Sequence, residues 1–256
     1  GALMQSPERK DRQKAFYSMF NAYKDMINTI ATIYIGNVKK NVFYSQVRKY
    51  ENCLDRATSG EDVSIDVYYR LLDCINDNIP LLHRYLRYRR RALGYKTLQM
   101  YDLHVPITGG DSLGVEYEEA CKIVKEALKP LGEEYAGLLE KAFNEGWIDV
   151  YENKGKRSGA YSWGCYGTHP YVLLNYQKTT HDIFTIAHEL GHAMHTYYSN
   201  ANQAYPKADY KIFVAEVAST VNEVLLLRHL LSKAEGEQKK YLLSYLLDMF
   251  RTTVFR

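Results

Sequence analysis

Residues 182–198 read DIFTIAHELGHAMHTYY, and they contain the motif His188-Glu189-Leu190-Gly191-His192. Apolar residues fall on most sides of the predicted helix, so we expect this helix to be buried in the core. Positions i and i+4 share one helix face, so the two imidazoles can reach a single metal ion. Glu189 lies about 100° around the axis from His188 and can face a water on that ion. A buried helix does not need two histidines and a glutamate for solvation, so these residues must have another role. The H-E-x-x-H pattern therefore predicts a metal site.

A lone carboxylate in the next apolar stretch, FVAEVA at 213–218, is the candidate third ligand. Burying an unpaired carboxylate is costly, so we expect Glu216 to be buried and either paired, protonated or bound to a metal. From His192 to Glu216 is 216 − 192 = 24 positions, enough for a loop and a returning helix. Two histidines and a glutamate with an open fourth position form a catalytic zinc site, so we expect one Zn²⁺ ion. For Glu216 alone, a buried salt bridge to an arginine is the alternative.

Three further polar residues lie on the same two predicted helices. Glu223 and Ser219 are candidates to accept a hydrogen bond from a ligating imidazole, and surface ion pairing is the alternative for Glu223. His195 is seven residues from His188, about 10.5 Å along a helix axis, so the two cannot share one ion. We expect His195 either to line a cleft or to be a satisfied core histidine.

Helical periodicity dominates the remaining sequence, and it predicts a mainly α fold with a small β-sheet or hairpin beside the motif helix. Residues 159–166 and 171–176 read as two strands, and Pro80 is expected to end a helix that begins near residue 64. We expect one continuous domain, with a helical region at 1–150 and the metal-binding core at 151–256. The expected helices cover about 7–35, 37–50, 64–78, 81–93, 117–128, 131–143, 182–198, 210–231 and 238–256.

Composition narrows the class of protein. The 256 residues are 46% hydrophobic and carry a net charge of +3, which argues for a globular chain that binds neither nucleic acid nor a membrane surface. Four cysteines without a CxxC pair read as reduced thiols, so we expect a cytoplasmic protein. The basic run RYLRYRRR at 84–91 mixes arginine with aromatic residues, as nucleic-acid sites do. Its apolar residues fall on one helix face, which favours a solvated surface helix.

The chain as a whole resembles the oligoendopeptidase F family, which is grouped with the thimet-oligopeptidase-like zinc peptidases. The resemblance implies zinc held by His188, His192 and Glu216, Glu189 as general base, and cleavage of internal bonds in short oligopeptides. Family members extend further at both ends, and their C-terminal part supplies His and Tyr residues that contact substrate. We therefore expect a central piece of such a protein that turns over poorly by itself. The matching segments are 101–103, 147–150, 155–162, 169–176, 188–195 and 213–223.

Peptidases with this site geometry bind substrate as a strand added to a sheet edge. The backbone of Gly159, Ala160, Tyr161 and Ser162 is the candidate edge, and a purely structural hairpin is the alternative. We expect oligopeptides as partners, while the oligomeric state stays open. Two other functions remain: a zinc exopeptidase, and a chain that binds peptides without efficient turnover.

Overall fold

The computed structural model describes residues 2–109 and 113–255, and the chain divides into two compact units. The helical unit comprises residues 1–109 with 247–256, and the site unit comprises residues 110–246. The sequence predicts one continuous domain whose two regions meet at 150/151. Residues 113–150 group with the site unit because their helices and first strand contribute to the same hydrophobic core as the motif helix.

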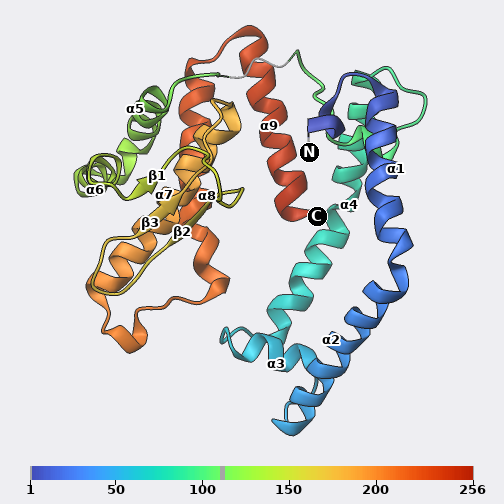
Figure 1. Ribbon diagram of the computed structural model, residues 1–256, viewed down its shortest axis with the longest axis horizontal. Helices are drawn as coiled ribbons and strands as arrows, with labels where there is room; N and C mark the ends of the chain where they lie inside the picture. The colour runs from blue at the N-terminus through green and yellow to red at the C-terminus, as the bar shows by residue number, and fades with distance from the viewer. Residues whose placement is uncertain (1, 110–112, 256) are drawn as a thin grey trace. The chain divides into compact units, whose positions relative to one another are not determined.

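The protein is mainly α-helical, as the sequence predicts (Figure 1). The helical unit holds η1 (Ala2–Gln5), α1 (Arg9–Asp25), α2 (Ile27–Val47), α3 (Cys53–Ser59), α4 (Ile65–Ala92) and η2 (Met100–Asp102). The site unit holds α5 (Tyr117–Leu128), η3 (Lys129–Leu131), α6 (Glu133–Asn144), β1 (Ile148–Asp149), β2 (Tyr161–Trp163), β3 (Tyr171–Leu173), α7 (Thr180–Asn202), η4 (Tyr205–Lys207) and α8 (Ile212–Lys233). The last helix, α9 (Gly236–Val254), begins in the site unit and ends in the helical unit.

Two breaks between helices are placed differently from the prediction. Pro80 lies inside α4, so the two expected helices are one continuous helix of 28 residues. An internal proline loses one backbone hydrogen bond and costs about 3 kcal/mol, which the remaining turns of a long helix can offset. The long N-terminal helix instead breaks at Met26, and the segment from residue 27 to residue 47 forms a single helix, α2.

A small three-stranded sheet lies beside α7, with strand order β1-β3-β2. β2 and β3 are the two predicted strands, each shorter than expected, and they pair antiparallel with Ser162 opposite Val172. The sequence analysis did not predict β1, which pairs parallel with β3 and places Ile148 opposite Val172. β2 is therefore an edge strand. Gly164, the residue after β2, packs directly against α7, because a Cβ at this position would clash with Thr196.

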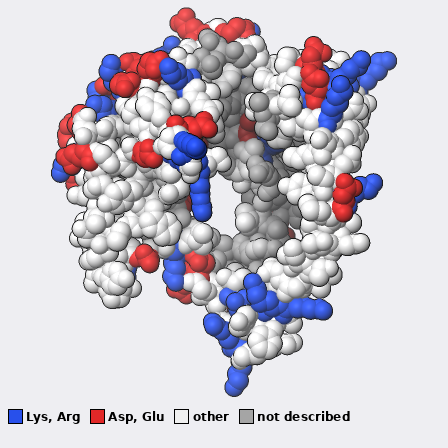
Figure 2. Space-filling view, in the orientation of Figure 1, with Lys and Arg blue, Asp and Glu red and all other residues white. Residues whose placement is uncertain are grey.

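The core of the site unit surrounds α7, which confirms the prediction that the motif helix is buried. Its apolar residues Ile183, Phe184, Ile186, Ala187, Leu190, Ala193 and Met194 are at most 1% exposed. They pack against the apolar faces of α5, α6 and α8. Charged side chains of the site unit gather over α5 and α6 on the side shown in Figure 2. Within 2–109 and 113–255, no helix combines the length and apolar character needed to cross a membrane.

The helical unit contains a buried charge network centred on Asp102, which the sequence analysis did not single out. The carboxylate binds Arg9 Nη2 at 2.8 Å and Arg12 Nη2 at 2.9 Å, and it accepts the Gln99 backbone N–H at 2.9 Å. The side chains of Arg12 and Asp102 are fully buried. Burial by itself would raise the pKa of Asp102, but the hydrogen bonds from Arg9, Gln99 and Arg12 hold that pKa below its ordinary value.

We expect Asp102→Asn to destabilise the protein by about 3–5 kcal/mol at pH 7, because it leaves Arg12 charged and buried without a counter-charge. The lowered pKa of Asp102 means that this contribution is present above about pH 4 and is lost as the pH falls further. The difference between wild type and variant in urea denaturation should therefore stay constant from pH 7 to about pH 4 and shrink as the pH falls below that value. Asp73→Asn removes an exposed carboxylate of α4 and should change stability by less than about 0.5 kcal/mol. Equal effects of the two variants at pH 7 would contradict the importance of the network.

Candidate active site

A capping box fixes where α7 begins. The Asp182 backbone N–H donates to Thr179 Oγ1 at 3.2 Å, and the Thr179 N–H donates to the Asp182 carboxylate at 2.9 Å. The two residues satisfy backbone groups that the first helical turn leaves free. On the helix that begins here, His188 and His192 are four residues apart, so they lie one turn apart and point in the same direction.

His188, His192 and Glu216 converge on one point. The Nε2 atoms of the two imidazoles lie 3.1 Å apart, and each lies 3.4 Å from Glu216 Oε2. Ligands at about 2.0–2.2 Å from a tetrahedral zinc ion are separated by about 3.3–3.6 Å, so the triangle formed by these three ligand atoms has the right size for zinc. In the described part of the chain, these three residues form the group of His, Cys, Asp or Glu side chains that could hold a metal ion.

The close crossing of α7 and α8 produces this convergence. Gly191 lies directly against the α8 backbone, and a Cβ at that position would be 2.6 Å from Ser219 Cα and 2.8 Å from Ala218 O. No side chain fits in that space, so glycine lets the two helix backbones approach. The crossing point lies one residue before His192 and three residues after Glu216, which brings the third side chain to the two imidazoles.

The expected burial of Glu216 is wrong, although its side chain does reach the two histidines. Its side chain is 64% exposed, and its apolar neighbours Phe213 and Val217 are 61% and 59% exposed. The first half of α8 extends past the core, so the apolar letters around Glu216 do not report burial. In the described structure the carboxylate accepts a hydrogen bond from Ser219 Oγ at 2.7 Å, and no arginine is paired with it.

Glu223 and Ser219 take different positions around the three converging side chains. His188 Nδ1 lies 2.5 Å from Glu223 Oε1, so the ring nitrogen that is not directed at the three ligand atoms has a carboxylate partner. Ser219 was expected beside an imidazole, but it donates to Glu216 instead. Burial by itself would lower the pKa of His188, and the hydrogen bond with Glu223 raises it above its ordinary value.

A buried asparagine that the sequence analysis missed ties α8 to α7. Asn222 is 1% exposed, donates to the Ala187 carbonyl at 2.9 Å and shares a hydrogen bond with Tyr135 OH of α6. Burial raises the pKa of Tyr135 to about 12, which keeps its hydroxyl protonated. The available signal was a polar residue inside the apolar stretch after Glu216, but nothing in the sequence identified its partners.

Glu189 lies beside the three ligand atoms in a protected position. The residue is 7% exposed, and the backbone of Ser162 in β2 forms a hydrogen bond with its carboxylate. Burial raises the pKa of Glu189 above its ordinary value, and the charge of Glu216 acts in the same direction. A carboxylate with a raised pKa accepts a proton more readily, which suits a general base.

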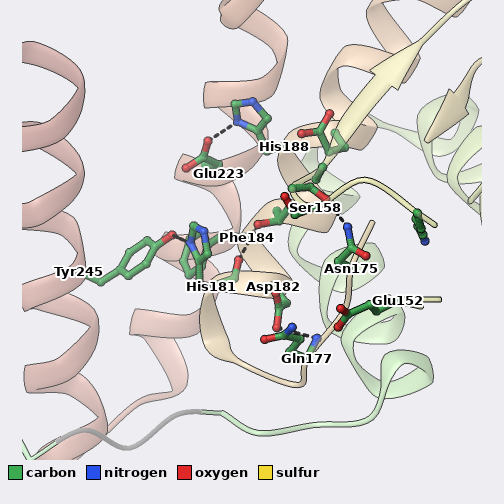
Figure 3. A pocket seen from close by; sticks show the side chains of 15 residues that line it. Glu152, Ser158, Asn175, Gln177, His181, Asp182, Phe184, His188, Glu223 and Tyr245 are labelled. Atoms are coloured by element: carbon green, nitrogen blue, oxygen red, sulfur yellow. Dashed lines mark hydrogen bonds and ion pairs between the residues drawn. The ribbon is translucent and has the colours of Figure 1, made fainter. Parts of the chain in front are cut away.

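A cavity of about 590 Å³ opens beside His188 and Glu189. Figure 3 shows Glu223 and Tyr245 on one side of it, from α8 and α9, with Asn175 and Glu152 on the other. The volume lies within the range of small-molecule and peptide-binding pockets. The described lining comprises Glu152, Lys156, Ser158, Gly159, Ala160, Asn175, Gln177, His181, Asp182, Phe184, Thr185, His188, Glu189, Glu223 and Tyr245.

The residues expected to contact substrate separate into two groups. Gly159 and Ala160 line the cavity, and Ser162 contacts Glu189 through its backbone, while the Tyr161 side chain is half-exposed on the edge strand. His195 is not part of the described lining. Its ring stacks on Tyr210 with centroids 3.7 Å apart and an interplanar angle of 9°, and its buried Nδ1 atom has no hydrogen-bond partner in the described structure.

A helical fold in which an H-E-x-x-H helix meets a glutamate from the next helix is the arrangement of the zincin class of proteins. The family profile described as Peptidase family M3 matches residues 2–256. The chain belongs to this family, and the resemblance to oligoendopeptidase F is confirmed.

Three relatives illustrate the similarity. The chain is 45% identical to Oligopeptidase PepF of Bacillus subtilis, over 99% of this chain and 38% of that protein. It is 40% identical to Group B oligopeptidase PepB of Streptococcus agalactiae, over 100% of this chain and 42% of that protein. The crystal structure of oligoendopeptidase-F from Enterococcus faecium superposes with a TM-score of 0.68 at 30% identity, covering 100% of this chain and 38% of that one. The chain therefore spans about two fifths of the length of these relatives.

We expect Gly191→Ala to push α7 and α8 apart, because the added methyl group meets backbone atoms that cannot rotate away. Overpacking of this kind costs about 1–3 kcal/mol, and displacing Glu216 from the histidines should weaken zinc binding. Thermal unfolding without metal and zinc titration measure the two effects separately.

Gly137→Ala in α6 is the matched control, since a Cβ there meets nothing within 4 Å. Alanine in an open helical position should raise stability by about 0.5–1 kcal/mol and leave zinc affinity unchanged. If Gly191→Ala behaved like Gly137→Ala, the close crossing would not control the geometry of the three ligands.

Proposed function

We propose that this protein is a zinc-dependent endopeptidase that hydrolyses internal bonds of short oligopeptides. The convergence of His188, His192 and Glu216 beside Glu189 carries this proposal, because the spacings match the distances between ligands of a tetrahedral zinc ion. Membership of Peptidase family M3 and relatives named oligopeptidase or oligoendopeptidase support it.

His188, His192 and Glu216 would hold the metal ion through two nitrogens and one carboxylate oxygen. When bound, zinc supplies Lewis-acid chemistry: it lowers the pKa of a water to about 7 and polarises a carbonyl. Glu189 takes one proton from the water as the oxygen adds to the scissile carbonyl carbon. It then gives that proton to the leaving nitrogen as the C–N bond breaks. Water is thereby divided between the new carboxyl group and the new amine.

Glu223 and Ser219 position the ligands in this proposal. Glu223 holds the Nδ1 proton of His188, which directs the Nε2 lone pair toward the metal position. Ser219 Oγ donates to Glu216 Oε2 at 2.7 Å and restrains a carboxylate that is otherwise exposed. Such partners fix the tautomer and the orientation of the ligating groups.

The edge strand β2 would bind the peptide backbone. Its partner β3 occupies one side, so the other edge is available for an added strand beside Glu189. The segment before β2 is fastened to the sheet, because Asn175 Nδ2 donates to the carbonyls of Arg157 and Gly159 at 2.8 Å. Main-chain recognition through Gly159, Ala160, Tyr161 and Ser162 would accept many different side chains.

The charges in the cavity favour internal cleavage over a carboxypeptidase activity. Capture of a free C-terminal carboxylate requires an available cation, and the lining that the structure describes contains a single lysine, Lys156. Its ammonium group is occupied by Asp149 Oδ1 at 3.2 Å and by the Tyr151 carbonyl at 2.7 Å.

Zinc analysis together with an internally quenched peptide blocked at both ends tests the function. Cleavage inside the blocked peptide supports the endopeptidase, while zinc loading with cleavage of unblocked peptides alone would support an exopeptidase.

We expect Glu189→Gln to retain zinc and lose turnover, because the amide keeps the shape but cannot accept the proton of water. His188→Ala and His192→Ala should lose zinc, since two remaining ligands hold the ion poorly. Glu216→Gln should weaken zinc binding. Metal content by atomic emission and peptide cleavage are measured on the same samples. Near-stoichiometric zinc in either histidine variant, or identical behaviour of the two glutamate variants, would contradict these roles.

A further inference from the structure

The cavity beside the candidate active site contains one charged group without a partner in the described structure. Most of the ionisable groups that line it are already engaged. Lys156 is held by Asp149 and by main-chain carbonyls, and Asp182 caps α7. Glu223 contacts His188, and His181 Nδ1 lies 3.3 Å from Tyr245 OH.

Glu152 is the exception. It lies in the loop after β1, is exposed, and has no hydrogen bond or ion pair within the described ranges. Figure 3 places its side chain across the cavity from His188, next to Gln177. A carboxylate in this position contributes an unbalanced negative charge to the wall of the cavity, away from the point where the bond would be cleaved.

We propose that Glu152 gives the cavity a preference for peptides that carry a lysine or arginine side chain at a position other than the two residues joined by the cleaved bond. This inference rests on the proposed function, because it assumes that the cavity holds a peptide. The long side chain of lysine or arginine can span the cavity and place its charged end in the solvated region where Glu152 lies. Main-chain binding along β2 sets the register, and the charge at Glu152 selects among peptides in that register.

The expected preference is modest because Glu152 is exposed. An exposed ion pair of this kind corresponds to about a three- to fivefold difference in dissociation constant at low salt. It should decline at high ionic strength, where the Debye length falls to about 3 Å at 1 M salt. A free α-amino group could meet the same carboxylate, so the peptides must be acetylated and amidated.

The experiment measures binding rather than cleavage. A fluorescent blocked peptide is scanned with a single lysine at each of three positions on either side of the bond that the enzyme cleaves. Each peptide is titrated against the zinc-loaded protein in the Glu189→Gln background, which prevents turnover. One position away from the cleaved bond should bind about three- to fivefold more tightly with lysine than with its neutral isostere norleucine.

Variants assign that preference to Glu152. Adding Glu152→Gln should abolish it, and Glu152→Lys should reverse it in favour of glutamate at the same position. Glu145→Gln is the matched control, because Glu145 is an exposed carboxylate of the site unit that does not line the cavity. A lysine preference that survives Glu152→Gln, or that Glu145→Gln removes equally, overturns the proposal.

Failure of this proposal can be separated from failure of the proposed function. Wild-type protein that cleaves the blocked peptide while the lysine scan is flat would retain the endopeptidase and overturn the role of Glu152. Zinc-loaded protein that binds no blocked peptide and cleaves none would overturn both. A lysine preference without cleavage of any peptide would support Glu152 and contradict the endopeptidase.

Discussion

The geometry of the candidate active site depends on how closely two helix backbones approach. Gly191 of α7 touches the α8 backbone at Ala218 and Ser219. Every group in the site is placed relative to that crossing: the two histidines on α7, Glu216 and Glu223 on α8, and Asn222 beside the Ala187 carbonyl. The core around α7 consists of buried apolar side chains, and close-packed interiors resist displacement, so this arrangement cannot be adjusted without cost elsewhere. The small residue inside the motif is therefore as important to the site as the polar residues on either side of it.

The sequence predicts the parts of the site that follow from local periodicity. The fixed rotation of a helix places His188 and His192 on one face, and the apolar residues between them predict burial. Tertiary context explains the misses. The apolar sequence around Glu216 predicts burial, but the first half of α8 lies outside the core. Pro80 predicts a helix end, but α4 continues beyond it. β1 has two residues, too few to show the alternating pattern of a strand. It is a strand because it pairs with β3, and that pairing forms only in the folded chain. Glu152 and Tyr245 are distant from the motif in sequence, so only the folded chain shows that they line the cavity.

Buried carboxylates serve two opposite purposes in this chain. Asp102 is surrounded by arginine side chains, and the resulting ion pairs lower its pKa and hold the helical unit together. Glu189 is also buried, but no arginine or lysine is paired with it in the described structure, and its pKa is raised. The first environment keeps a carboxylate ionised at neutral pH, where it has a structural role. The second leaves a carboxylate able to exchange a proton, which is the property a general base needs.

The capping box at the start of α7 has a consequence for how the length of this chain can change. Thr179 and Asp182 fix the beginning of the helix, and Thr180 Oγ1 accepts the backbone N–H of Leu113. One residue inserted between Asp182 and His188 would rotate the motif by about 100° and move it by about 1.5 Å. An insertion directly after Asp182 would also turn Ile183 and Phe184 out of the core. The exposed residues 203–207 have no such restriction, because the Gly191 crossing determines where α8 lies. In the same connection Ala208 is buried and Tyr210 stacks on His195, so these two positions are fixed. Insertions and deletions should therefore accumulate between the two ligand-bearing helices and be excluded from the seven positions 182–188.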